Sequence, residues 1–256
     1  MLDAAQALYL RLLKRCLTRM LFPDSRYDHE SGDATHPLPF DPKRREIGCD
    51  WPTEAETMVG MLRLDNLESC VTQVVADGIP GDLVECGVWR GGSSIFMRGL
   101  LKVLNDTRRK VWVCDSFEGL PPPDPDKFPD DHGDAHWTLN AYLGVPLETV
   151  EANFRRYELL DEQVRFLKGW FRDTLPAGPF DDGIAVLRLD GDMYESTWVA
   201  LESLYPKLAR GGFVIIDDYS SWEGCRKAVD TFRSSVGITE PLAPIDWAAV
   251  YWRRAG

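Results

Sequence analysis

The sequence has little positive charge and no long hydrophobic run. Its 256 residues carry 41 Asp and Glu against 29 Lys and Arg, and no basic stripe suggests a nucleic-acid-binding surface. Anionic membranes repel an acidic chain, and no stretch of about 18 apolar residues could span a bilayer. The start Met-Leu-Asp lacks the basic residues of a secretion signal. We therefore expect a cytoplasmic protein that binds neither nucleic acid nor membranes.

Several motifs are also missing. The six cysteines form no C-x-x-C pair and no Cys/His cluster with zinc spacing, and Cys86 and Cys114 lie in apolar runs. We expect these two to be small core residues in a reducing compartment. The G-x-G-x-x-G fingerprint, a Tyr-x-x-x-Lys pair and the Gly-Lys-Ser/Thr of a P-loop do not occur. These absences argue against an NAD-dependent nucleotide-sugar oxidoreductase, which remains an alternative function.

Strand-like and helical patterns alternate along most of the chain. Apolar spacing predicts helices over 2–22, 54–75, 93–104, 147–160, 197–208 and 225–235, and strands over 83–86, 111–114, 164–167, 184–189 and 213–216. Ile245 and 250–252 predict a terminal hairpin. This alternation predicts an α/β fold with a doubly wound, mostly parallel sheet, a C-terminal antiparallel hairpin and extra N-terminal helices.

Two proline-rich segments interrupt this alternation. Residues 23–52 predict an irregular connector, so we divide the chain into an N-terminal helix with connector (1–52) and a catalytic domain (53–256). The segment at about 120–140 is too long for an ordinary connection. It follows the second strand of the sheet at the expected ligand-binding edge, which favours an active-site lid. A disordered surface insertion is the alternative.

Two predicted strands run directly into aspartates. Asp190 follows the strand over 184–189, and Asp217 and Asp218 follow the strand over 213–216. If these strands are neighbours, the three carboxylates meet at one edge of the sheet, where like charges repel. A divalent cation removes this repulsion, and all-oxygen ligands suit Mg²⁺ or Mn²⁺. The sequence therefore predicts a metal site, with unrelated surface carboxylates as the alternative.

Three further features favour a nucleotide-like cofactor at the same edge. A glycine-rich turn over 87–92 follows the first predicted strand, where the backbone can approach a ligand or simply turn tightly. Asp115 ends the next strand, where an acid can accept both ribose hydroxyls or cap a turn. Gly169, Trp170 and Phe171 follow the third strand, and they could hold an adenine face or be ordinary core aromatics.

The stretch Asp-Leu-Val-Glu-Cys-Gly-Val-Trp-Arg-Gly-Gly resembles the first motif of macrocin-type O-methyltransferases, which use S-adenosylmethionine (SAM) and methylate sugar hydroxyls of natural products such as macrolides and aminocoumarins. Matching stretches extend from about residue 8 to the C-terminus and include 8–18, 57–60, 115–121, 164–171, 190–197 and 216–219. The resemblance implies a class I SAM-methyltransferase (Rossmann-like) fold, SAM as methyl donor, a Mg²⁺-type ion and a glycosylated small-molecule acceptor.

The resemblance also implies roles for individual residues. Those near the methionine end of SAM, along the cofactor and at its ribose are Thr57, Met58, Gly60, Glu85, Gly87, Asp115 and the adjoining Ser116. Asp190, Asp217 and Asp218 match the metal carboxylates of the family. Many metal-dependent O-methyltransferases have Asp-Asn at the second and third of these positions. This chain has Asp217-Asp218 instead, and it shares this Asp-Asp pair with macrocin-type enzymes. An intact set of acids argues against a non-catalytic binding protein, the remaining alternative.

Methyl transfer also needs a base, because a sugar hydroxyl is a poor nucleophile at neutral pH. Asp192 lies two residues beyond Asp190 and can face the same way, so we predict that it is the general base; a helix cap or structural acceptor is the alternative. His136 is the second candidate, unless it is merely solvated. Tyr194 and Trp137 are predicted to contact the acceptor. The amphipathic N-terminal helix is expected to pack on its own domain or on a second subunit, and we favour a homodimer or higher homo-oligomer.

Overall fold

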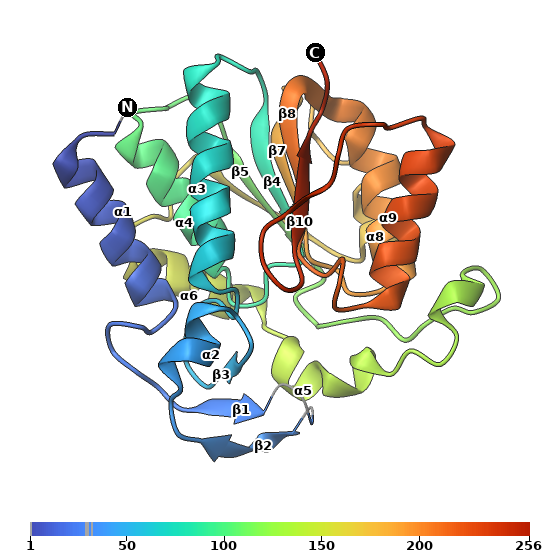
Figure 1. The fold of residues 1–256 in the computed structure, drawn as a ribbon, viewed down its shortest axis with the longest axis horizontal. Helices are drawn as coiled ribbons and strands as arrows, with labels where there is room; N and C mark the ends of the chain where they lie inside the picture. Colours follow the sequence, from blue (N-terminus) through green and yellow to red (C-terminus); the bar gives the residue numbers. More distant parts are fainter. Residues whose placement is uncertain (1, 29–30, 32) are drawn as a thin grey trace.

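A seven-stranded sheet forms the centre of the computed structural model, which describes residues 2–28, 31 and 33–256 (Figure 1). Its strands are, in order across the sheet, β6 (Val164–Lys168), β5 (Val111–Asp115), β4 (Asp82–Cys86), β7 (Ile184–Leu189), β8 (Leu208–Ile216), β10 (Val250–Arg253) and β9 (Ala243–Pro244). The first five are mutually parallel, whereas β10 pairs antiparallel with both β8 and β9. The predicted mostly parallel sheet with a C-terminal hairpin is confirmed.

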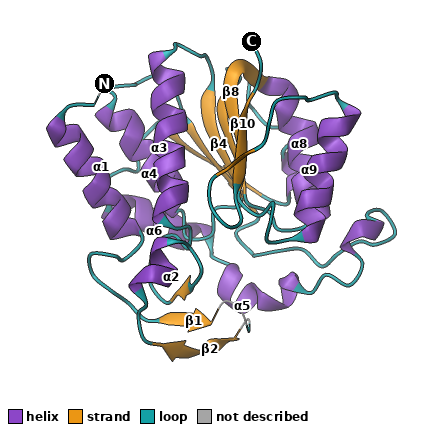
Figure 2. Cartoon of the chain, in the orientation of Figure 1, coloured by secondary structure: helices purple, strands orange, loops and turns teal. Residues whose placement is uncertain are grey.

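Helices cover both faces of this sheet (Figures 1 and 2). One face carries α1 (Ala4–Leu17), α3 (Met61–Ala76), α4 (Gly92–Val103) and α6 (Leu147–Arg156). The other carries α7 (Phe171–Thr174), α8 (Tyr194–Leu204), the short helix η3 (Tyr205–Lys207) and α9 (Glu223–Ser235). Successive side chains of β4 alternate between the two cores, since Leu83 packs with the first group and Val84 with the second. Cys86 and Cys114 are buried in the second core, as predicted.

The predicted helix over 54–75 begins only at Met61. Gly60 caps it, and a Cβ on this glycine would lie 2.5 Å from backbone atoms of Glu46 and Gly48. The preceding residues follow an irregular, bent path, and Arg90 donates to the carbonyl oxygen of Ala55 there at 3.0 Å. Tertiary contacts therefore override helical periodicity here, and they leave 53–60 free to enter the site.

The region expected to be an irregular connector contains regular structure. Its elements are β1 (Arg26–Asp28), β2 (Asp33–Leu38), α2 (Pro42–Glu46) and β3 (Trp51–Pro52), and the three strands form a small antiparallel sheet. Fully buried Arg45 pairs with Asp24 at 2.6 Å and with Asp50 at 2.9 Å. Arg45 and Asp24 are 21 positions apart, and a contact over such a separation leaves no local periodic signal. Helix α1 buries Leu10 and Leu17 in the same core as the sheet, so the N-terminal segment packs on the catalytic domain.

The long segment after β5 is ordered into short helices: η1 (Pro129–Asp131), η2 (His136–Leu139) and α5 (Asn140–Leu143). It passes beneath the lower edge of the sheet in Figure 1. Asp131 is buried and accepts hydrogen bonds from the backbone N–H groups of Tyr194 and Glu195, at 2.7 and 2.9 Å. The segment is thus fastened to the start of α8. None of the helices in the described ranges is both long and apolar enough to cross a bilayer.

Candidate active site

The carboxyl ends of the parallel strands meet at one edge, beside an open cavity of about 1070 Å³. The chain reverses its direction of travel across the sheet between β4 and β7, which is where ligands bind in open α/β sheets. Ten of the predicted site residues line this cavity: Thr57, Met58, Glu85, Gly87, Asp115, His136, Asp190, Asp192, Asp217 and Asp218.

Gly87 allows the ends of β4 and β7 to come together. Its φ is +86°, and a Cβ at this position would lie 1.7 Å from the carbonyl oxygen of Asp190. No side chain fits there without moving one of the strand ends. The glycine therefore sets the distance between the cofactor turn and the acidic loop after β7.

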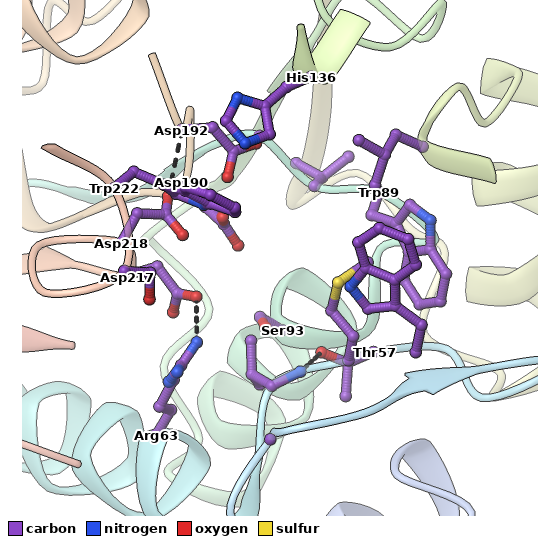
Figure 3. Close-up of a pocket in the computed structure, with 18 of the residues that line it drawn as sticks. Thr57, Arg63, Trp89, Ser93, His136, Asp190, Asp192, Asp217, Asp218 and Trp222 are labelled. Atoms are coloured by element: carbon purple, nitrogen blue, oxygen red, sulfur yellow. Dashed lines mark hydrogen bonds and ion pairs between the residues drawn. The ribbon is translucent and has the colours of Figure 1, made fainter. Parts of the chain in front are cut away.

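Three aspartates converge on one point of the cavity wall (Figure 3). Asp190, Asp192 and Asp218 each offer a carboxylate oxygen, and these atoms lie within 4.8 Å of one another. The backbone N–H of Asp192 donates to Asp218 at 3.2 Å, and Asp192 has a φ of +56°. This tight turn points its side chain back toward the other two acids.

Asp217 faces away from this cluster and toward two arginines. It pairs with Arg63 from α3 (Figure 3) and with Arg188 from β7. Arg188 also contacts Asp190 at 3.0 Å and Glu85 at 2.6 Å, and Arg63 contacts Asp246 at 2.7 Å. The structure thus groups Asp192, rather than Asp217, with the other two carboxylates of the predicted metal site.

The pKa values of the acids follow this division. Burial, with Asp217 nearby, raises the pKa of Asp190 to about 8, and burial raises the pKa of Asp192 to about 6 despite neighbouring His136. Burial and the neighbouring acids raise the pKa of Asp218 well above its usual value. For Asp217, burial acts in the same direction, but Arg188 and Arg63 outweigh it and lower the pKa. The positive charge of Arg188, Arg63 and His136 thus only partly offsets burial and mutual repulsion in the clustered acids, and a divalent cation fits this donor set.

Five of the residues predicted to hold the cofactor line the same cavity as the acids. Thr57 and Met58 come from the irregular segment before α3, and Glu85 is buried and accepts hydrogen bonds from Ser94 and Arg188. Asp115 accepts from the backbone N–H groups of Val88 at 2.8 Å and Phe117 at 2.7 Å. These bonds fix the Asp115 carboxylate at the cavity wall, so it both stabilises a turn and faces the cavity.

A second cavity adjoins the first, and Asp115 lines both. Ser116, Trp170 and Phe171 line only the second cavity. Gly60 and Gly169 line neither, and they act through the backbone, as the N-cap of α3 and as a residue with φ +141° after β6.

His136 reaches the acidic cavity from the segment 120–140. Its Nδ1 contacts Asp134 at 2.8 Å, its ring lies edge-on to Trp222 at 4.0 Å, and it faces Asp192 in Figure 3. Burial would lower the pKa of His136, but the nearby carboxylates outweigh it and raise it. The predicted acceptor contacts Trp137 and Tyr194 line neither cavity, because Trp137 is exposed and Tyr194 stacks on Trp198.

Several cavity residues were missed from the sequence. The cavity has aromatic walls, formed by Trp51, Trp89 and Trp222. Two arginines, Arg63 and Arg188, offset part of the negative charge of its aspartates. Arg188 had a visible signal, since a lone charge in the buried run 184–189 requires a partner. The tryptophans had none, because their positions depend on how loops meet.

The whole chain can be compared with known proteins. A family model described as macrocin-O-methyltransferase (TylF) matches residues 6–254. The chain belongs to this macrocin O-methyltransferase family. Its members are SAM-dependent O-methyltransferases with a class I fold, and the sheet and cofactor edge described above are those of that class. The predicted family and enzyme class are therefore confirmed.

Similar curated proteins are O-methyltransferases. This methyltransferase is 54% identical, over 99% of its chain and 95% of the relative, to the 8-demethyl-8-(2,3-dimethoxy-alpha-L-rhamnosyl)-tetracenomycin-C 4'-O-methyltransferase of Streptomyces olivaceus. It is 48% identical to the mycinamicin III 3''-O-methyltransferase of Micromonospora griseorubida, over 97% of its chain and 96% of the relative. Among solved structures, the O-methyltransferase NovP superposes with a TM-score of 0.90 at 46% identity, covering 98% of this chain and all of NovP.

Proposed function

We propose that this methyltransferase transfers the methyl group of SAM to a sugar hydroxyl of a glycosylated natural product in antibiotic biosynthesis. The names of two relatives give a rhamnosyl tetracenomycin and mycinamicin III as their substrates. The proposal rests on one observation above all, which is that the acidic cluster and five of the predicted cofactor residues line the same cavity. A reacting hydroxyl held at the acids would therefore lie beside the methyl donor.

The residues assigned to the cofactor bind SAM and orient its methyl group toward the acceptor. Bound SAM supplies an electrophilic methyl group on a sulfonium. We assign its ribose to Asp115, whose carboxylate is already held by two backbone N–H groups, and its methionine end to Thr57 and Met58. Holding the donor and acceptor in register contributes to the rate through a high effective concentration.

We propose that Asp190 and Asp218 hold a Mg²⁺- or Mn²⁺-type ion. These two carboxylates belong both to the sequence prediction and to the observed cluster. A bound cation would lower the pKa of the acceptor hydroxyl and fix its position. The third carboxylate is Asp217 according to the family resemblance and Asp192 according to the distances in this structure. Metal titrations of Asp217→Asn and Asp192→Asn decide between them, because the variant that lacks a ligand binds the ion more weakly.

We propose that Asp192 removes the proton of the acceptor hydroxyl. Its side chain faces the cavity beside Asp190, and His136 lies on its far side (Figure 3). A proton accepted by Asp192 can pass toward His136, which faces it (Figure 3). His136 remains the second candidate for the base, and substitution of each residue in turn separates the two roles.

The proposal is tested with SAM, Mg²⁺ and a panel of glycosylated macrolides, aminocoumarins and tetracenomycins, each incubated with the enzyme and analysed by mass spectrometry. We expect one acceptor to gain the mass of a single methylene unit, with loss of the product in EDTA and recovery on adding Mg²⁺. Turnover that is unchanged after EDTA and dialysis would refute the metal. Binding of NAD in preference to SAM would favour the oxidoreductase alternative.

The association of two chains and the cytoplasmic location also remain proposals. Helix α1 exposes Leu8 and Leu12, 57% and 47% accessible in the single chain. Sedimentation velocity of the wild type gives the mass of the assembly directly, and a monomer at all concentrations would contradict the predicted pairing.

A further inference from the structure

The second cavity, of about 470 Å³, extends from the acidic cavity toward α7 and α8. Gly87, Asp115 and Asp190 line both cavities, so a ligand held at Asp115 can reach from one into the other. Beyond Asp115, most of the wall is apolar or aromatic and consists of Leu120, Pro121, Trp170, Phe171 and Val199. Flat apolar walls of this kind suit an aromatic ring system.

One charged group of this wall has an unused hydrogen-bonding atom. Glu195, in the first turn of α8, lines the cavity with a side chain that is only 5% exposed. Its Oε1 accepts a hydrogen bond from Arg172 at 3.0 Å. Its Oε2 is buried and has no hydrogen-bond partner among the residues that the structure describes. A buried carboxylate oxygen is costly to leave without a donor, so this atom points to a ligand donor.

The Glu195 carboxylate is also held firmly. Its backbone N–H donates to buried Asp131 at 2.9 Å, which ties it to the segment over the site. Arg172 lies in α7, directly after the aromatic residues of the same cavity wall. The free oxygen therefore has a fixed position relative to the apolar slot, which is the arrangement that gives hydrogen-bond specificity.

We propose that Glu195 Oε2 accepts a hydrogen bond from the 6-amino group of adenine and thereby selects an adenosyl cofactor over other purine nucleosides. Adenine combines apolar faces with one exocyclic amino donor, and it extends from a ribose that we assign to Asp115. Guanine presents a carbonyl oxygen at position 6, which a carboxylate repels. This inference rests on the proposed placement of SAM, with its ribose at Asp115.

The test measures two ligands against two variants by isothermal titration calorimetry. The ligands are S-adenosylhomocysteine and its 6-deamino analogue, which carries purine in place of adenine. The variants are Glu195→Met and the control Glu202→Met, which makes the same change at an exposed position of the same helix. We expect wild type and the control to bind the adenine compound at least about tenfold more tightly than the analogue. In Glu195→Met the two ligands should bind equally.

Results that would overturn the role of Glu195 can be told apart from results that would overturn SAM as the cofactor. If Glu195→Met weakens both ligands equally and keeps the discrimination, the residue is only structural and the inference is overturned. The same holds if wild type binds the two ligands with equal affinity. If wild type binds neither ligand, the assignment of SAM to these cavities is wrong. Should Glu195→Met fail to fold, Glu195→Gln keeps the Arg172 contact and should still lose the discrimination, with Glu202→Gln as its control.

Discussion

Replacing Arg188 by Met tests whether one arginine holds the acidic site together. Arg188 is 2% exposed and contacts Glu85, Asp190 and Asp217. Met has a similar length and fills the space, but it leaves three carboxylates without this counter-charge. Removing one partner of a buried ion pair typically costs about 3–5 kcal/mol. We therefore expect Arg188→Met to lower the free energy of unfolding by about 3–5 kcal/mol. This is a large part of the roughly 5–15 kcal/mol by which a protein is stable.

The assay is urea unfolding followed by far-UV circular dichroism, in EDTA and in Mg²⁺. The control is Arg226→Met, an exposed position on α9 where the change should stay within about 0.5 kcal/mol. If the acids bind the ion, Mg²⁺ at about 100 times its Kd should restore about 2.7 kcal/mol. A loss below about 1 kcal/mol for Arg188→Met would show that the carboxylates do not depend on this arginine. If Arg188→Met does not fold, Arg188→Lys keeps the charge and should fall between wild type and the expected loss.

Three further changes test other parts of the site. Gly87→Ala should lower the free energy of unfolding by at least about 1 kcal/mol and weaken SAM binding, because its Cβ would meet the carbonyl oxygen of Asp190. Urea unfolding measures the first effect and calorimetry the second. No change in either would mean that the strand ends can separate freely. Asp131→Ala should remove a helix cap worth about 0.5–2 kcal/mol and speed proteolysis of 120–140. The control Asp130→Ala loses only an exposed ion pair with Lys227 and should leave the rate of proteolysis unchanged. Equal proteolysis of both variants would contradict the role of Asp131 in fastening this segment. Asp192→Asn should lower kcat about 100-fold or more with little change in acceptor KM, and steady-state kinetics showing normal turnover would remove it from the base role.

Local patterns in the sequence were sufficient for the sheet. The run over 184–189 is apolar except for Arg188 and is followed by Asp190, and β7 has those same bounds. The acids at the ends of neighbouring strands were brought to one cavity because the carboxyl ends of parallel strands share an edge. Burial of Cys86 and Cys114 followed from the apolar runs around them. These features depend on residues that are adjacent in the chain, so periodicity reveals them.

Only the tertiary structure decided how the charges pair. Arg63 and Asp217 are 154 positions apart, yet their contact turns Asp217 away from the other carboxylates and leaves Asp192 in its place. The unpaired oxygen of Glu195 depends in the same way on Arg172 and on the segment that carries Asp131. A charged side chain takes its partner from whatever the fold places beside it. The sequence could therefore predict the acidic edge of the sheet, whereas the role of each acid depended on distant parts of the chain.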